Sequence, residues 1–220
     1  MIAQDMISDT IYAAKASDSL QSLLDRMNEY NVKQLPFIRY NQFVGLVHEE
    51  DIKSALSENE DSKLKDVSHE LIFIFNTQHF YDVVRLFFIH QLDVLAVVDE
   101  KHHYCGCITL HDVIQTLAQI TTSDEPGAII VLEVNNRDNS LAHIAQIVES
   151  DNAQILSSYV RRFPDSTRVE ITIKLNRTDV ASIVAAFLRY EYHVKATFNE
   201  LRADDSSRDR YEQLMNYLNM

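Results

Sequence analysis

The residues best suited to chemistry lie in two short stretches that share one pattern. In each, a glycine is followed by two apolar residues, then a polar residue, and an aspartate three positions later. In residues 45–51 the polar residue is His48 and the aspartate is Asp51. In residues 106–112 they are Thr109 and Asp112. A polar residue that opens a helix lies beside free amides and the positive end of the helix, which attract anions. The spacing Thr-x-x-Asp is also that of a helix capping box, which needs no ligand.

A second candidate is the stretch 102–107, which holds two histidines and two cysteines, the usual ligands of zinc. Alternation along a strand puts Cys105 and Cys107 on one face, so we expect both to be small core residues. The histidines fall in the preceding turn, and we expect no metal site. Nor does any Ser, His and Asp set or Cys and His set have the spacing of a shared catalytic site, so we expect no enzyme.

Composition excludes several other classes of function. The 220 residues carry 20 basic and 33 acidic side chains, a net charge of −13, which attracts neither nucleic acid nor an anionic membrane. The three glycines lack the spacing of a dinucleotide fingerprint, a P-loop or a nucleophile elbow. No apolar run approaches the roughly 20 residues of a membrane span, and the start does not resemble a signal peptide. With only two cysteines, we expect a cytoplasmic protein without disulfides.

The elements that position these residues repeat along the chain. Helical periodicity predicts helices over 17–30 and 77–90, offset by 60, with Ser17 and Thr77 as their N-caps. Each predicted helix has one apolar stripe, formed by Leu20, Leu23, Leu24 and Met27 in the first and by Phe80, Val83, Val84 and Phe87 in the second. Each repeat begins with a short strand, at 10–13 or 71–74. A hairpin and a second helix complete each repeat. In the first repeat the hairpin strands are 34–38 and 43–47 and the helix is 49–56. In the second repeat the strands are 94–98 and 104–108 and the helix is 110–120.

A turn-rich segment at 121–127 separates the repeats from a third unit. Its predicted elements are strands at 128–134, 153–160, 168–175 and 193–198 and helices at 140–148 and 179–190, the ferredoxin-like order βαββαβ. The sequence thus predicts an α+β protein with units at 1–60, 61–123 and 127–200. A polar tail at 201–220 includes one short apolar-faced helix at 211–218.

The two repeats resemble a tandem pair of CBS motifs. The resemblance rests on residues 35–38 and 45–51 in the first repeat and on 95–99 and 106–112 in the second. The second repeat matches the family pattern fully, and the first departs from it at His48. Residues 127–198 resemble an ACT domain but lack the usual glycine before the first helix, at 137–141. The whole arrangement is similar to bacterial CBS proteins of the acetoin-utilisation type.

This resemblance implies a cleft for an adenosine derivative between the repeats. Asp112 would accept hydrogen bonds from both ribose hydroxyls, and Thr109 would meet the phosphate. Lys33 lies where relatives often place a basic residue near the phosphates. The apolar residues expected around the ligand are Ile108, Ile72, Phe73, Pro36 and Ala96. His48 and Asp51 would form a weaker second cleft, because an imidazole is bulkier than a hydroxyl.

The sequence therefore predicts a non-enzymatic sensor of an adenine nucleotide of the AMP, ADP or ATP class. It would act as a homodimer on an unknown regulated protein, with no required cofactor. Three alternatives stay open. One is a sensor of another adenosyl ligand, such as S-adenosylmethionine or a cyclic dinucleotide. Another is an interaction scaffold whose cleft stays empty. The third is a metal-dependent or hydrolytic enzyme, which bound zinc or ATP turnover would reveal.

Overall fold

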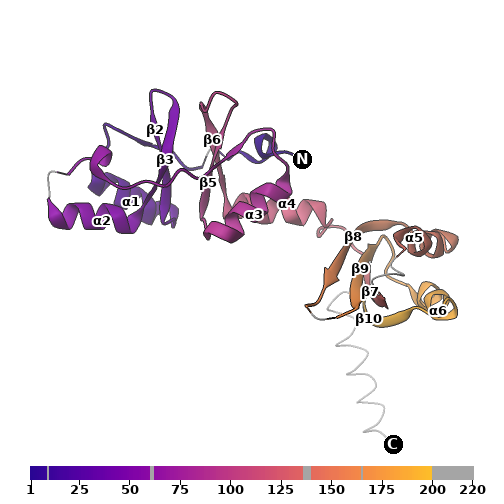
Figure 1. The fold of residues 1–220 in the computed structure, drawn as a ribbon. Helices are drawn as coiled ribbons and strands as arrows, with labels where there is room; N and C mark the ends of the chain where they lie inside the picture. Colours follow the sequence, from indigo (N-terminus) through magenta and orange to yellow (C-terminus); the bar gives the residue numbers. More distant parts are fainter. Residues whose placement is uncertain (9, 60–61, 136–139, 165, 200–220) are drawn as a thin grey trace, which may run out of the picture. The chain divides into compact units, whose positions relative to one another are not determined.

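The two repeats predicted from the sequence are present as two β-α-β-β-α motifs (Figure 1). The computed structural model describes residues 1–8, 10–59, 62–135, 140–164 and 166–199. Both motifs belong to one compact unit, Met1–Leu117, and a second unit, Ala118–Met220, holds the remaining elements. The predicted tail helix at 211–218 and residues 137–139 lie outside the described residues.

The first motif is a three-stranded sheet with two helices. Strand β1 (Ala14–Lys15) pairs in parallel with β2 (Gln34–Arg39), which pairs antiparallel with β3 (Gln42–His48). Tyr40 and Asn41 form the hairpin turn and both have positive φ, 50° and 62°, as a tight two-residue turn requires. The helices are α1 (Leu20–Tyr30) and α2 (Glu49–Glu58).

The second motif repeats this arrangement with the sheet order β4-β5-β6. A short 3-10 helix precedes each motif, η1 (Ala3–Met6) before the first and η2 (Leu64–Asp66) before the second. Because hairpin and helix positions match the sequence pattern, the predicted strand-helix-strand-strand-helix order is confirmed. The elements of the second motif are β4 (Phe73–Phe75), α3 (Phe80–His90), β5 (Val94–Val98), β6 (Tyr104–Thr109) and α4 (Leu110–Ile120).

The predicted N-caps of α1 and α3 are wrong by two residues. Ser19 caps α1, because its side chain accepts a hydrogen bond from the amide of Ser22 at 3.2 Å. His79 caps α3 by accepting from the amide of Tyr81 at 3.2 Å. Ser17 lies instead inside a turn closed by a hydrogen bond from the amide of Asp18 to the carbonyl of Lys15 at 2.9 Å. Thr77 likewise precedes the cap.

The apolar stripes of α1 and α3 form the predicted cores with one exception. Every stripe residue of α1 is buried, and in α3 only Val84 is exposed. Phe87 is also buried, at 6% exposure, whereas the neighbouring Phe88 is 83% exposed. Phe87 therefore belongs to the core, and Phe88 lies on the outer face of α3.

The prediction that both cysteines are core residues is wrong for Cys105. Cys107 is fully buried, but Cys105 is exposed. The reason is a β-bulge: Val97 pairs with Gly106 and Val98 pairs with Tyr104, so Cys105 has no partner in the ladder. A bulge inserts one residue and reverses the alternation of faces beyond it.

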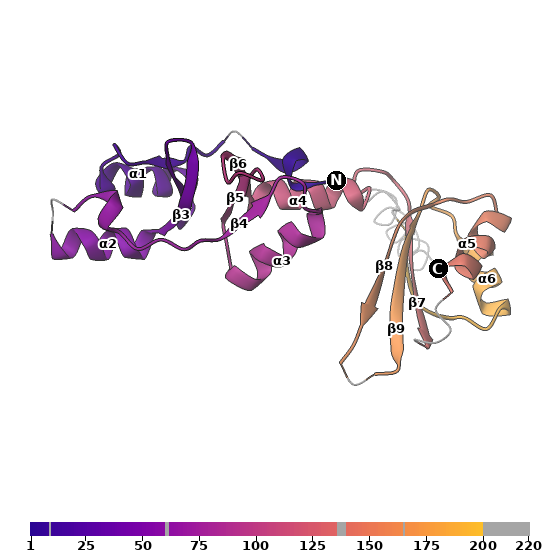
Figure 2. The same ribbon diagram turned by 45° about the horizontal axis from the view of Figure 1, so that its top comes forward.

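The second unit has the predicted ferredoxin-like fold. Its four antiparallel strands follow the order β10-β7-β9-β8, and both helices pack on the same face of the sheet (Figure 2). The buried residues of α5 and α6 form one apolar core with the inward residues of the sheet, mainly valine, isoleucine and leucine. The elements are β7 (Ala128–Asn135), α5 (Leu141–Ser150), β8 (Ile155–Arg162), β9 (Arg168–Leu175), α6 (Ala181–Arg189) and β10 (His193–Asn199).

Candidate functional site

Thr109 and Asp112 form a reciprocal pair where β6 meets α4. Oδ2 of Asp112 accepts hydrogen bonds from the backbone amide of Thr109 at 2.8 Å and from its Oγ1 at 2.6 Å. The backbone amide of Asp112 in turn donates to Oγ1 of Thr109 at 3.2 Å. These three contacts are those of a capping box, so the pair stabilises the start of α4 whether or not a ligand binds.

Capping leaves part of the Asp112 carboxylate for other partners. In the described part of the chain, each of its hydrogen bonds ends on Oδ2. An ionised carboxylate accepts hydrogen bonds at both oxygens. Oδ1 is therefore the atom through which Asp112 can hold a donor from a ligand, such as a ribose hydroxyl.

A pocket of about 460 Å³ lies beside this pair and combines residues of both motifs. The first motif contributes the segment before β1 and the end of α1, and the second contributes the start of β5 and the first turn of α4. Both motifs contribute apolar and polar side chains to its lining. Its lining residues are Thr10, Ile11, Tyr30, Asn31, Val32, Asp93, Thr109, Leu110, His111, Asp112 and Ile114.

The charge of this pocket is negative. Asp93 and Asp112 line it, and its lining set includes no lysine or arginine. The carboxylate of Asp93 is held in place, because Oδ2 accepts a hydrogen bond from the backbone amide of Lys33 at 2.9 Å. The amide of Asp93 donates to Oε1 of Gln34 at 3.0 Å. Like charges repel, so the pocket disfavours a ligand with several negative charges.

The structure brings Thr109 and Asp112 together but not the other residues predicted around them. Ile108 and Ala96 are fully buried in strands, and Pro36 is buried in β2. Ile72 and Phe73 are partly buried against the core of the second motif, and Lys33 is exposed. None of these six residues lines the Asp112 pocket, and their role as ligand contacts stays a prediction.

The equivalent position in the first motif differs in chemistry. His48 occupies the cap position of α2, but its side chain makes no capping hydrogen bond. Its Nε2 is buried with no hydrogen-bond partner among the described residues, 3.7 Å from Oε2 of Glu70. The first turn of α2 adds Glu49, Glu50 and Asp51. An imidazole therefore takes the position that Thr109 has in the second motif, with Glu70 beside it and three acidic residues in the helix turn that follows.

The stretch considered for zinc has another arrangement. His103 Nδ1 lies 2.9 Å from Oδ2 of Asp99, and this hydrogen bond is the main cause of the lowered pKa of Asp99. Loss of hydration around its sulfur and the neighbouring Asp99 carboxylate raise the pKa of the Cys105 thiol, although the residue as a whole is exposed. Across the described ranges, no three His, Cys, Asp or Glu side chains gather as a metal site. Over the same ranges, no helix has the length and hydrophobicity needed to cross a membrane.

Comparison with curated proteins finds relatives that match parts of the chain. The UPF0053 protein MG146 homolog of Mycoplasma pneumoniae is 28% identical over 98 residues, which are 43% of this chain and 23% of that protein. Inosine-5'-monophosphate dehydrogenase of Bifidobacterium longum is 30% identical over 114 residues, 49% of this chain and 21% of the enzyme. Hypoxic response protein 1 of Mycobacterium tuberculosis is 37% identical over 57 residues, 26% of this chain and 40% of that protein. The chain thus spans well under half the length of each of these relatives.

Two solved structures resemble the chain over about half of its length. A CBS domain pair/ACT domain protein from Thermotoga maritima is 26% identical, with a TM-score of 0.48, and the match covers 54% of this chain and 98% of that one. CBSX2 in complex with AMP is 22% identical, with a TM-score of 0.47, and the match covers 54% of this chain and 97% of that one.

The family is settled by a match that includes both glycine-to-aspartate stretches. The family model for the CBS domain matches residues 3–58 and 64–119, together just over half of the chain. Each matched segment contains one β-α-β-β-α motif of the first unit. By fold, by repeat and by this match, the chain belongs to the CBS domain family.

Proposed function

We propose that the chain is a non-enzymatic regulatory protein that binds one adenosine-derived small molecule in the Asp112 pocket. The observation that carries the proposal is the Asp112 carboxylate. One of its oxygens caps α4, and the other is available at the edge of a pocket between the two motifs. A carboxylate at the start of a helix is a suitable acceptor for the vicinal hydroxyls of a ribose.

The walls of the pocket fit the remainder of a nucleoside. Ile11, Val32 and Ile114 supply apolar surface on two sides, and Tyr30 adds a partly exposed aromatic ring. A planar purine placed between such walls loses little hydration and gains close contacts. Asn31 supplies a side-chain amide that can both donate to and accept from the edge of a base.

The charge of the pocket narrows the class of ligand. Asp93 and Asp112 face a ligand that meets no lysine or arginine in the lining set. We therefore expect S-adenosylmethionine and adenosine to bind more tightly than AMP, and AMP more tightly than ATP. The sulfonium of S-adenosylmethionine is a cation that Asp93 would attract, whereas each added phosphate increases the repulsion.

Regulation would follow from the position of the pocket between the motifs. A ligand that contacts both motifs favours the packing in which its two sets of contacts form together. The equilibrium between packings then depends on ligand concentration, which is the basis of a sensor. The output would pass to a regulated protein.

We also infer that the chain acts as a homodimer through the outer faces of α3 and α4. These faces carry large apolar side chains with helical spacing, all exposed in the single chain. Exposed apolar patches of this kind are typical of protein interfaces. The residues are Tyr81, Val84 and Phe88 on α3 and Leu117 on α4.

Calorimetric titration of the full chain with S-adenosylmethionine, adenosine, AMP, ATP and a cyclic dinucleotide tests the proposal. Asp112→Asn should weaken binding by about 1.5 to 3 kcal/mol, because an amide donor replaces one acceptor. The matched control is Asp82→Asn, the same change in the first turn of α3 and outside the pocket, which should leave binding intact. Unchanged affinity for adenosine and S-adenosylmethionine in Asp112→Asn would refute the proposed site. If none of the compounds binds, the proposal fails and the scaffold alternative is favoured.

A further inference from the structure

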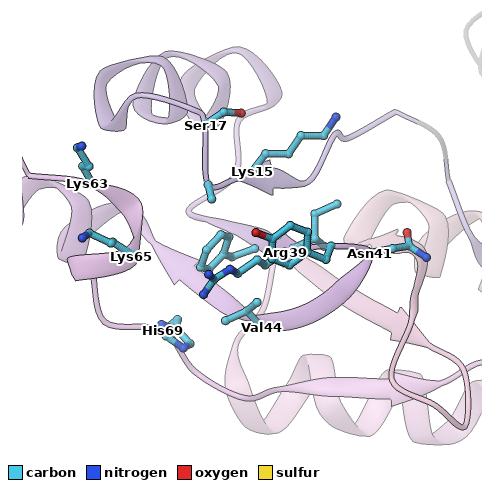
Figure 3. Close-up of a pocket in the computed structure, with 12 residues that line it drawn as sticks. Lys15, Ser17, Arg39, Asn41, Val44, Lys63, Lys65 and His69 are labelled. Atoms are coloured by element: carbon cyan, nitrogen blue, oxygen red, sulfur yellow. The ribbon is translucent and has the colours of Figure 1, made fainter.

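A second pocket, at the other end of the first motif, has the opposite charge. It has a volume of about 730 Å³ and lies where β1, the β2–β3 hairpin and the segment between the motifs meet (Figure 3). It shares no lining residue with the Asp112 pocket. We call it the basic pocket. It is lined by Lys15, Ala16, Ser17, Phe37, Ile38, Arg39, Tyr40, Asn41, Val44, Lys63, Lys65 and His69.

The charged residues of the basic pocket are all cationic. Lys15, Arg39, Lys63 and Lys65 line it together with His69, and no carboxylate does. Across the described residues, none of the four lysine and arginine side chains forms an ion pair with an acid. Such a concentration of unpaired positive charge stands out in a chain whose net charge is −13.

Comparison of the two motifs indicates that the fold does not need these charges. Lys15 pairs with Ile38 as Phe75 pairs with Val98, so Phe75 is its counterpart, and Asp99 is the counterpart of Arg39. Lys63 precedes η2 as Ile2 precedes η1. By the same alignment Lys65 corresponds to Gln4. The counterparts of all four residues, Phe75, Asp99, Ile2 and Gln4, therefore occupy equivalent places in the fold without a positive charge.

The side chains of the basic pocket lie where a ligand could reach them. Figure 3 shows Arg39, Lys65 and His69 on one side of the pocket, whereas the ammonium of Lys15 points away from them. Arg39 lies over the ring of Tyr40, 5.4 Å from its centroid. The absence of a side chain at Gly45 leaves room for the His69 ring, because a Cβ there would come within 2.7 Å of Cδ2 of His69. Phe37, Ile38 and Val44 add apolar surface.

We propose that the basic pocket binds the polyphosphate chain of a small molecule. Several cations from separate segments match a ligand with several negative charges better than a single carboxylate or phosphate. The chain could be free polyphosphate or the tail of a nucleoside polyphosphate, which share this chemistry. In the second case Tyr40 offers an aromatic face on which a base could stack.

Calorimetric titration of the full chain with sodium tripolyphosphate at low salt tests the proposal. The wild type should bind one tripolyphosphate per chain, and raising the salt concentration should weaken the binding because ions screen exposed charges. The double variant Arg39→Gln, Lys65→Gln should lose at least about tenfold in affinity, since it removes two charged donors. The matched control is Lys101→Gln, an exposed lysine in the hairpin of the second motif, which should bind as the wild type does.

Two results would overturn the site. One is wild-type affinity in the double variant. The other is an equal loss in Lys101→Gln, which would indicate diffuse attraction to positive charge. If circular dichroism shows that the double variant is unfolded, the single variant Lys65→Gln, with about half of the loss in log affinity, decides the question. An ATP titration then identifies the source: ATP binding more tightly than tripolyphosphate indicates a nucleotide, and equal affinity indicates the phosphate chain alone.

The same measurements separate this proposal from the one for the Asp112 pocket. Asp112→Asn should leave tripolyphosphate affinity unchanged, because Asp112 does not line the basic pocket. The double variant should in turn retain the affinity for adenosine. Either proposal can therefore fail while the other stands.

Discussion

The carboxylate of Asp93 accepts a hydrogen bond from the backbone amide of Lys33 at 2.9 Å, and the two residues occupy equivalent positions in the two motifs. The backbone carbonyl of each residue accepts a hydrogen bond from the first residue of the helix that follows the hairpin. The carbonyl of Lys33 accepts from the amide of Glu49 at 2.9 Å, and that of Asp93 accepts from the amide of Leu110 at 3.0 Å. The two motifs therefore make the same backbone hydrogen bonds where α2 and α4 begin. Their side chains differ, and Asp93 places a carboxylate in the lining of the Asp112 pocket.

Asp93→Asn should raise the affinity for AMP relative to that for adenosine. The amide oxygen of asparagine can still accept from the amide of Lys33, so the local backbone should be preserved. Removal of one unit charge at about 6 Å from a phosphate in a water-like medium is worth on the order of 0.7 kcal/mol, about threefold in affinity. Competition between the two ligands measures the ratio. An equal change for adenosine and AMP would show that Asp93 does not act through its charge.

Much of the fold could be predicted because periodicity and repetition report on burial. The stripe from Leu20 to Met27 is buried as its spacing requires, and the hairpins follow from short apolar runs around tight turns. The errors fall where local contacts compete. Ser17 is a chemically suitable cap, but a turn closed by Asp18 moves the helix start to Ser19. No composition rule places the bulge that exposes Cys105.

The candidate site could be predicted only within one motif. Thr109 and Asp112 are three residues apart, so their pairing depends on local geometry, which the sequence contains. The opposite wall comes from Thr10 and Ile11, about a hundred residues earlier, instead of the Ile72 and Phe73 segment. Packing between the motifs decides whether the segment before β1 or the segment before β4 lies beside the start of α4. The internal repeat does not distinguish the two possibilities.

Thr109→Ala should destabilise the first unit by about 1 kcal/mol, the usual cost of losing an N-terminal cap. Both the hydroxyl contact to Asp112 and the acceptor for its amide disappear. Thr109→Ser retains the hydroxyl, and its free energy of unfolding should lie within a few tenths of a kcal/mol of the wild-type value. Urea unfolding followed by circular dichroism measures the difference. If alanine and serine destabilise the unit equally, the loss comes from packing and not from capping.

Binding should be limited to one adenosine ligand per chain. In the first motif the imidazole of His48 replaces the hydroxyl of Thr109, and Glu70 lies 3.7 Å from its Nε2. We therefore expect the equivalent position in the first motif to be a poorer site for a ribose phosphate. Asp51→Ala should leave stoichiometry and affinity unchanged in a calorimetric titration at pH 8, whereas Asp112→Ala should abolish binding. Two equivalent sites per chain would show that His48 is no obstacle.

The carboxyl group of Asp99 should titrate below the usual aspartate pKa of about 3.9. The hydrogen bond from His103 is the main cause of the lowered pKa, and backbone amides of His103 and Lys101 assist it. A lowered pKa favours the folded state above the unfolded pKa, and this contribution is lost as the pH falls through the folded pKa. Carbon-13 NMR should show that the titration midpoint of the Asp99 carboxyl group rises in His103→Gln. It should remain slightly below that of an ordinary aspartate, because the backbone hydrogen bonds are kept. Lys101→Gln, which keeps both backbone amides, should barely move it.

The outer faces of α3 and α4 should hold two chains together. Phe88 is 83% exposed in the middle of this surface, next to Tyr81 and Val84 on the same helix face. The corresponding face of α1 carries Gln21 and Asn28, so the apolar surface belongs to the second motif alone. We expect light scattering to give a mass near twice 25.4 kDa. High salt should not dissociate the dimer, since apolar contacts are not screened.

Phe88→Glu should convert this dimer to a folded monomer. The change places a charge at the centre of an apolar interface, where it would be buried without a partner, and in the free chain the side chain would remain in water. Tyr40→Glu makes the same kind of change at an aromatic residue that is 88% exposed in the β2–β3 turn, and it should leave the dimer intact. Sedimentation velocity over a concentration series compares the three proteins. A wild type that stays monomeric at tens of micromolar, or a Phe88→Glu variant that still dimerises, would place the interface elsewhere or remove it.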